Sequence, residues 1–266
     1  MGRLAILAGS GGLPLRLAEA VPEAICISFA GVPHDLGVKA QEHAFEKLGA
    51  LFQALKAQDV TDVVMAGGMS RPPLDPAAFD SVMQELAPRL LVAMQSGDDG
   101  LLRIVIDIFE EQGFAVKGAH EVDPSLTAAA GIMAGAELVS RAQADAARGV
   151  KILAALSPLD VGQGTVVEHG QCLAVETLQG TDAMLGFVAA TPEHLRKGAG
   201  VFVKAPKIGQ DLRVDMPAIG PETIRATHRA GLGAVVIAAN RVLVIDRQAT
   251  VELAESLGVT LVAMDL

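Results

Sequence analysis

Aromatic side chains are nearly missing from this chain, which has no tryptophan or tyrosine and only eight phenylalanines among 266 residues. Stacking platforms for nucleic-acid bases are therefore scarce, and aliphatic side chains and alanine must build the core. Long apolar runs are absent too, since none approaches the roughly 18 residues of a membrane-spanning helix. The N-terminus leads directly into an expected strand at residues 3–8 without a signal-peptide pattern, so we expect a protein of the cytoplasm.

Cysteine and positive charge are also sparse. Cys26 and Cys172 lie far apart, with no further thiol or histidine at metal-ligand spacing, so we expect both to be buried apolar residues. The formal net charge of −10 opposes non-specific binding to nucleic acid or to an anionic membrane surface. We therefore expect no nucleic-acid partner, and any anionic ligand must be held by a few local basic groups.

The first half of the chain alternates short apolar runs with amphipathic stretches, a pattern typical of βα units around a parallel sheet. Apolar residues fall on one face of two expected helices, at residues 44–56 and 98–112. An alanine-rich stretch at residues 124–148 is also predicted to be helical. The expected strands are residues 4–7, 24–29, 63–66 and 114–116.

The second half is richer in strands, beginning with a hairpin of residues 165–168 and 172–176 around Gly170. Further strands are expected at residues 201–204, 235–238, 242–245 and 260–263, with helices at 221–230 and 248–257. The predicted fold is α/β, with an N-terminal Rossmann-like parallel-sheet domain followed by a second mixed α/β domain and a ligand cleft between them. The predicted bounds are 1–130 for the first domain, 131–149 for a linker helix and 150–266 for the second domain.

Two glycine-rich loops follow expected strands. The first, Gly9 to Pro14, permits close backbone approach, and the helix after it offers free N–H groups to a phosphate. It lacks the third glycine of the dinucleotide fingerprint, so an anion-binding loop and a simple tight turn both stay open. The second, residues 67–72, adds Ser70 and Arg71, which could bind phosphate through two contacts; a surface position before a proline turn is the alternative for Arg71.

Two further motifs carry ionisable groups. Asp98 and Asp99 open an expected helix, where one carboxylate suffices as a cap and the second could be an Mg²⁺ ligand. His120 and Glu121 follow the strand at residues 114–116, where ligands bind in open α/β sheets. A structural or exposed histidine is the alternative reading of His120.

The segment from Lys204 to Pro221 has the densest mixture of charge, glycine and proline. If residues 211–216 are extended, Asp211, Arg213 and Asp215 share one face. A solvated charged face is the alternative, but the clustering favours a site. Such groups could support metal-assisted attack on a pyrophosphate, with carboxylates holding Mg²⁺ and orienting water while lysine and arginine neutralise phosphate oxygens.

Seven segments together resemble one family, and they read ILAGSGGLP, GGMSRP, GDDGLLR, GAHE, LDVGQGTVV, GTDAML and VKAPKIGQDLRVDMPAIGPETI. Their order and spacing are similar to those of the LpxI-type UDP-2,3-diacylglucosamine pyrophosphatases, nearly end to end. The resemblance implies Mg²⁺-dependent hydrolysis of that lipid-linked sugar nucleotide to UMP and 2,3-diacylglucosamine 1-phosphate in lipid A synthesis. It also implies a catalytic C-terminal domain and a homodimer, and a lipid substrate leads us to expect transient contact with the inner-membrane surface.

The resemblance carries roles onto particular residues. Asp215 is the first catalytic candidate and Asp211 the second, and Asp215, Asp99 and Asp211 are the metal candidates. The substrate-binding candidates are Gly11, Gly12, Leu13, Gly68, Ser70, Arg71, His120, Gln163, Thr181, Asp182, Lys204, Lys207, Gln210 and Arg213.

This chain also departs from the family pattern. Members often carry Glu and Gly where it has Ala238 and Asn240, and Thr where it has Ala218. Two other kinds of function fit the same motifs. A nucleotide-sugar oxidoreductase or transferase would use the glycine loops, and a non-catalytic nucleotide or lipid sensor would need the same cations.

Overall fold

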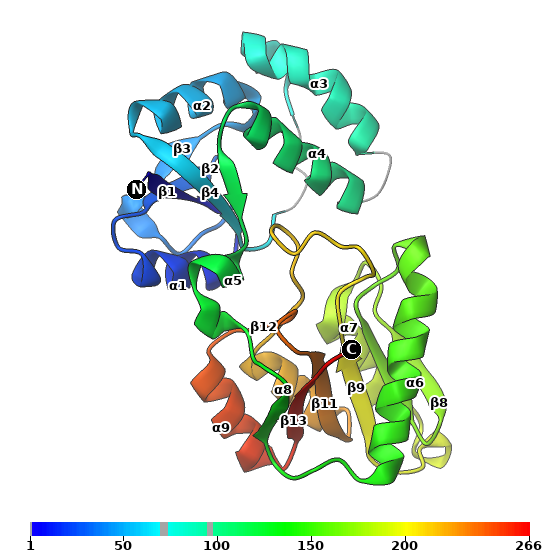
Figure 1. The fold of residues 1–266 in the computed structure, drawn as a ribbon. Coiled ribbons are helices and arrows are strands. Elements are labelled where there is room, and N and C mark those ends of the chain that lie inside the picture. Colours follow the sequence, from blue (N-terminus) through cyan, green and yellow to red (C-terminus); the bar gives the residue numbers. More distant parts are fainter. Residues whose placement is uncertain (1, 70–73, 95–97) are drawn as a thin grey trace. The chain divides into compact units, whose positions relative to one another are not determined.

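The computed structural model describes residues 2–69, 74–94 and 98–266, without the side chains of Asp98 and Asp99. Contacts divide the chain into two compact units, whose elements are labelled in Figure 1. Unit 1 comprises Met1–Pro124 and Asp211–Asp215, and unit 2 comprises Ser125–Gln210 and Met216–Leu266. The predicted α/β class with two units is confirmed. The predicted linker, residues 131–149, holds a strand and the first part of a helix, and both belong to unit 2.

Unit 1 is built around a five-stranded sheet in the order β3-β2-β1-β4-β5, in which every neighbouring pair is parallel. Its strand order reverses beside β1, which is where ligands bind in doubly wound folds. Four strands match the predicted apolar runs, whereas β3 escapes prediction because its residues Gln-Glu-His have no apolar member. The strands are β1 (Arg3–Ala8), β2 (Ile25–Phe29), β3 (Gln41–His43), β4 (Val60–Ala66) and β5 (Ala115–Lys117).

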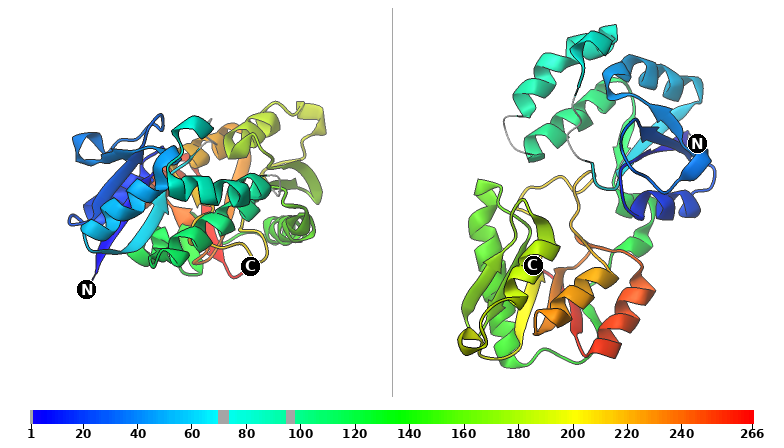
Figure 2. Two further views of the ribbon diagram at one scale, coloured as in Figure 1. Left: turned by 90° about the horizontal axis from the view of Figure 1, so that it is seen from above. Right: turned by 180° about the vertical axis from the view of Figure 1, so that it is seen from behind.

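Helices cover both faces of this sheet (Figures 1 and 2). Helices α1 (Leu13–Ala20) and α5 (Ala119–Val122) lie on one face, and α2 (Leu48–Ala57), α3 (Ser81–Ala93) and α4 (Asp98–Glu111) lie on the other. In the core on the second face, Phe52 of α2 meets Phe109 of α4 edge to face with ring centroids 5.3 Å apart. The described part of the unit also has the 3₁₀ turns η1 (Gly37–Lys39), η2 (Phe45–Lys47) and η3 (Pro76–Ala78).

Unit 2 has a six-stranded mixed sheet in the order β6-β13-β11-β9-β7-β8. Its three central strands are parallel to one another, and the strands outside them run antiparallel to their neighbours. The six strands are β6 (Gly131–Ala134), β7 (Gly164–Glu168), β8 (Gln171–Val175), β9 (Gly200–Lys204), β11 (Leu232–Ala238) and β13 (Thr260–Met264). A separate parallel pair joins β10 (Ala218–Ile219) to β12 (Leu243–Val244).

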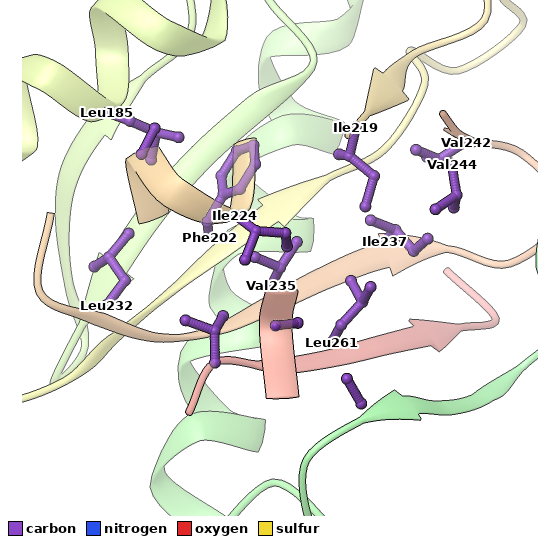
Figure 3. Packing of buried hydrophobic residues seen from close by; sticks show 14 of the residues in the cluster. Leu185, Phe202, Ile219, Ile224, Leu232, Val235, Ile237, Val242, Val244 and Leu261 are labelled. Atoms are coloured by element: carbon purple, nitrogen blue, oxygen red, sulfur yellow. The ribbon is translucent and has the colours of Figure 1, made fainter. Parts of the chain in front are cut away.

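Alternate residues of the central strands enter two different cores, as the pleat of a β-strand requires. Val201 and Val203 face α6 (Ser140–Leu156). Phe202 between them faces the opposite core, where Ile224 and Val235 lie close by (Figure 3). That core takes its helical residues from α7 (Gly180–Ala189), α8 (Pro221–Arg229) and α9 (Arg247–Leu257). The 3₁₀ turn η4 (Pro124–Leu126) joins the two units, and η5 (Ser157–Leu159) and η6 (Glu193–Leu195) belong to unit 2.

Two predictions from composition are wrong. The alanine-rich stretch at residues 124–148 is not one helix, because Gly131 and Gly135 adopt φ of 152° and 79° and bracket β6 before α6 begins at Ser140. Cys26 is buried as expected, but Cys172 on β8 is exposed. Within the described residues, no helix has the length and hydropathy that a membrane crossing requires.

The predicted hairpin around Gly170 is confirmed, and a buried carboxylate holds its turn. His169 and Gly170 form the two-residue connection between β7 and β8, with φ of 48° and 77°, the left-handed geometry of a type I′ turn. Asp145 of α6 is only 1% exposed. Its oxygens accept the N–H groups of His169 at 2.8 Å and Gly170 at 2.7 Å, so Asp145 fastens the hairpin to the helix.

We expect Asp145→Ala to lower the free energy of unfolding by about 3 kcal/mol, because two backbone N–H groups lose a charged acceptor. Urea denaturation followed by circular dichroism measures this loss. The matched control is Arg148→Ala, an exposed position on the same helix, which should change stability by less than about 0.5 kcal/mol. Equal effects of the two substitutions would contradict the assignment.

Candidate functional site

In unit 1 the two glycine loops are hydrogen-bonded to each other. The N–H of Ser10 donates to the carbonyl of Gly68 at 2.7 Å, and the N–H of Gly68 donates to the carbonyl of Ser10 at 2.9 Å. A β-carbon added to Gly9 would lie 2.4 Å from the Gly68 oxygen, and one added to Gly67 would lie 2.4 Å from the Ser10 oxygen. Both glycines are therefore needed for the close approach. The N–H of Gly68 is engaged within the protein, so Gly68 supports the first loop.

The first loop leaves the start of α1 open to a ligand. Gly11 and Gly12 are exposed, Gly11 has a φ of 90°, and α1 begins at Leu13 without a side-chain cap. The first N–H groups of a helix have no partner in that helix, and the helix dipole favours an anion there. This geometry suits the predicted phosphate contacts of Gly11, Gly12 and Leu13.

Three further candidates lie wholly or partly outside the described residues. Ser70 and Arg71 lie outside the described residues, and Asp99 falls in the first turn of α4 with its side chain outside the described part. Their predicted roles stay predictions.

His120 lies in the first turn of α5, directly after β5. The Glu121 carboxylate accepts the N–H of Gly118 at 2.6 Å and caps the helix start. A β-carbon on Gly118 would lie 2.5 Å from Cε1 of His120, so the imidazole occupies the space that glycine leaves. Nδ1 of His120 is buried and has no hydrogen-bond partner in the described part of the chain. A bound ligand or water could supply that partner.

Asp211–Asp215 form a turn of unit 1, and the extended conformation considered from sequence is wrong. The Oδ1 of Asp211 accepts the N–H of Arg213 at 3.0 Å, a local side-chain bond that favours a turn. The N–H of Asp215 then donates to the carbonyl of Asp211 at 3.4 Å. Asp211, Arg213 and Asp215 therefore do not share a strand face.

Arg213 and Val214 fasten this turn to the rest of unit 1. The guanidinium donates to both oxygens of Asp211, with the shortest bond 2.7 Å, and to Oε1 of Glu110 on α4, also at 2.7 Å. Val214 packs against the core of unit 1. A β-carbon on Gly118 would lie 3.4 Å from Cα of Arg213, so the turn is a neighbour of the segment that carries His120.

The ion pair separates the roles of the two aspartates. Hydrogen bonds from the Arg213 side chain hold the pKa of Asp211 below its usual value, and the pKa of Arg213 is raised in turn by Asp211 and then by Glu110. A carboxylate with a lowered pKa is a weak general base. Asp211 therefore orders the turn through Arg213, and Asp215 stays the first catalytic candidate on the family motif.

The described residues hold no group of three His, Cys, Asp or Glu side chains placed to bind a metal ion. Both oxygens of Asp211 already accept hydrogen bonds from Arg213, so Asp211 fits a ligand role poorly in this conformation. Mg²⁺ in phosphate sites is commonly bound by one or two carboxylates together with substrate oxygens. Asp215 and Asp99 have carboxylate side chains, so they could be the two protein ligands of such a site.

In unit 2, a buried lysine forms the centre of a polar cluster. Lys204 is the last residue of β9 and is 5% exposed. Its ammonium lies 3.3 Å from each carboxylate oxygen of Glu176 and donates to the hydroxyl of Thr181. The Thr181 hydroxyl donates to Oε1 of Glu176 at 2.7 Å, which closes a three-membered network.

Glycines of the VGQG motif make room for Glu176. A β-carbon on Gly164 would lie 2.6 Å from Oε2 of Glu176, and one on Gly162 would lie 1.9 Å from its backbone oxygen. The N–H of Glu176 donates to the carbonyl of Gly164 at 2.8 Å. The motif thus shapes the surroundings of a buried carboxylate.

Sequence reasoning missed Glu176. Its position could have indicated it, because Glu176 directly follows the apolar second strand of the hairpin, just as Lys204 lies at the carboxyl end of its own strand.

The remaining candidates of unit 2 lie apart from this cluster or at its margin. Lys207 pairs through its ammonium with Asp160, and its N–H donates to the side chain of Gln210 at 2.9 Å. Gln163 precedes β7, where its carbonyl accepts the N–H of Ala205 at 3.0 Å. Asp182 is exposed in the first turn of α7. Among the described contacts of unit 2, two pairs of predicted residues therefore touch, Thr181 with Lys204 and Lys207 with Gln210.

These features define an α/β protein whose first unit presents open backbone N–H groups at a sheet edge and whose second unit buries a cation at a strand end. Two family models match nearly the whole chain, the LpxI N-terminal domain at residues 3–126 and the LpxI C-terminal domain at residues 129–262. The UDP-2,3-diacylglucosamine pyrophosphatase LpxI of Caulobacter vibrioides is 40% identical over 276 residues, which cover 100% of this chain and 98% of that relative. The chain belongs to the LpxI family, as its motifs predicted.

We expect Asp211→Asn to lower stability at pH 7 by about 1 kcal/mol, the range of a partly exposed ion pair. Because the pKa of Asp211 is lowered in the folded protein, its contribution is present above the unfolded value of about 3.9 and is lost as pH falls through the folded value. The difference from wild type should therefore shrink between about pH 5 and pH 2. Thermal unfolding across this range measures it, with the exposed Asp35→Asn as a control whose difference should stay near zero.

Proposed function

We propose that this protein hydrolyses UDP-2,3-diacylglucosamine to UMP and 2,3-diacylglucosamine 1-phosphate, also called lipid X, in lipid A biosynthesis. The observation that carries this proposal is the 40% identity, over all of the chain, to a relative named for that pyrophosphatase activity. Water adds to one phosphorus of the pyrophosphate, and the bridging oxygen leaves with the other. The reaction needs no redox partner or transferred group besides water.

The described side chains supply groups suited to this chemistry. Asp215 would orient and deprotonate the attacking water from the end of the turn that Asp211 and Arg213 hold in place. The N-terminus of α1 and the Lys204 ammonium are suited to anionic phosphate oxygens. The Nδ1 of His120, which has no partner among the described residues, could form a hydrogen bond with substrate.

Mg²⁺ is the cofactor we propose for this reaction. Asp215 and Asp99 would hold it, and it would supply charge neutralisation at the phosphate oxygens. The support is the chemistry of these carboxylates and the anionic substrate. Asp211 is the weaker candidate, because Arg213 occupies both its oxygens.

The nature of the substrate also suggests where and how the protein works. A molecule with two acyl chains partitions into a membrane, so we propose a cytoplasmic protein that contacts the inner-membrane surface transiently. A homodimer, which the resemblance to the family implies, is part of the same proposal. Sedimentation of the purified protein, with and without vesicles that contain anionic lipid, separates the two suggestions.

The deciding experiment is release of UMP from purified UDP-2,3-diacylglucosamine, measured with Mg²⁺ and with EDTA. We expect Asp215→Asn to lower kcat by about 100-fold or more, the size of a lost general base, and to leave KM and the melting temperature nearly unchanged. Asp35→Asn, an exposed carboxylate on another loop, should behave as wild type.

Other outcomes would be equally informative. Substrate binding by the wild-type protein without UMP release would favour a non-catalytic sensor. Hydrolysis that survives EDTA would remove Mg²⁺ from the proposal and leave the reaction in place. Near wild-type turnover by Asp215→Asn would remove Asp215 from the catalytic role.

A further inference from the structure

Glu176 is a buried carboxylate to which the proposed reaction assigns no role. It is 9% exposed, follows β8, and directs both oxygens at the Lys204 ammonium. The hydroxyl of Thr181, in the first turn of α7, bonds to Oε1 of Glu176 and accepts a bond from Lys204. Four polar atoms are thus held together where a central strand of the sheet ends.

An ammonium group has three N–H donors. In the described part of unit 2, one direction is taken by Thr181 and another is shared between the two oxygens of Glu176. One donor is left for a ligand oxygen. Because a lysine head group rotates freely on a flexible stem, two fixed acceptors are what give the third donor a defined direction.

Stability alone does not account for this arrangement. A buried ion pair loses the hydration of both charges, and apolar side chains of similar volume often serve a core equally well. The pair also lies at the carboxyl end of β9, the edge of an α/β sheet where ligands bind. Both facts favour a role in binding.

We infer that Glu176 is a positioning residue, which with Thr181 aims the Lys204 ammonium at an anionic phosphate oxygen of the substrate. This inference rests on the proposed function, since it takes the pyrophosphate substrate as the ligand. Both oxygens of Glu176 face the ammonium of Lys204, and Oε1 also accepts the Thr181 hydroxyl, so the role inferred for Glu176 is to position Lys204 and not to contact substrate. It acts only through Lys204.

The test uses three variants of the full chain, Glu176→Gln, Lys204→Met and the double variant. Turnover is measured as kcat and KM for UMP release. Equilibrium binding of UDP-2,3-diacylglucosamine is measured in the Asp215→Asn background, where turnover is suppressed. Melting temperature is recorded for each variant.

We expect Glu176→Gln to weaken substrate binding and kcat/KM by about 10- to 100-fold, the effect of one charged hydrogen bond. Lys204→Met should have at least as large an effect. The double variant should equal Lys204→Met in binding, because Glu176 acts through the lysine and the two losses do not add. Its melting temperature should recover relative to Glu176→Gln, since no unpaired charge stays buried.

Glu168→Gln is the matched control, because Glu168 is also a buried carboxylate in the same sheet, paired with Arg196 at 2.7 Å. It should lower the melting temperature without changing substrate affinity. Binding by Glu176→Gln within twofold of wild type would overturn the inference, as would a double variant that recovers binding together with stability. A wild-type protein that binds the substrate without hydrolysing it would overturn the proposed reaction, and the binding series would still decide the role of Glu176.

Discussion

Several polar groups in this protein lie in space that exists only because a neighbouring residue has no β-carbon. Gly9 and Gly67 let two strand-end loops bond to each other, and Gly118 leaves room for the imidazole of His120. In unit 2, Gly164 does the same for the carboxylate of Glu176. A β-carbon at any of these glycines would collide with its neighbour. The hydrogen bonds of each candidate site therefore require glycine at these positions.

The second constraint is electrostatic. A chain with a net charge of −10 must attract an anionic substrate with few cations, and several of these are already paired. Arg196 pairs with Glu168, and Arg213 with Asp211. Attraction must then come from groups whose direction is fixed, such as the N–H groups of a helix start and a single buried ammonium.

Patterns of neighbouring residues predicted much of the fold. Apolar runs located most strands of both sheets, and the two-residue spacing around Gly170 located the hairpin turn. Strand β3 has no apolar residue and β6 lies in an alanine-rich stretch between two glycines, so neither carried a periodic signal.

The candidate site was predicted less completely than the fold. The motifs indicated Lys204 and Thr181, which the structure places in contact. The turn at Asp211–Asp215 depends on a bond that the backbone N–H of Arg213 donates to the Asp211 side chain, and Glu176 meets Lys204 across 28 residues of chain. Contacts of this kind depend on tertiary structure, which periodicity does not report.

The five residues Asp211–Asp215 belong to unit 1, although the chain on both sides of them belongs to unit 2. A gene fragment that ends or begins near Pro124 would therefore separate Asp215 from Glu110, which anchors its turn through Arg213. The two units are distinct in structure, yet the five residues that complete unit 1 are carried inside the stretch of sequence that builds unit 2.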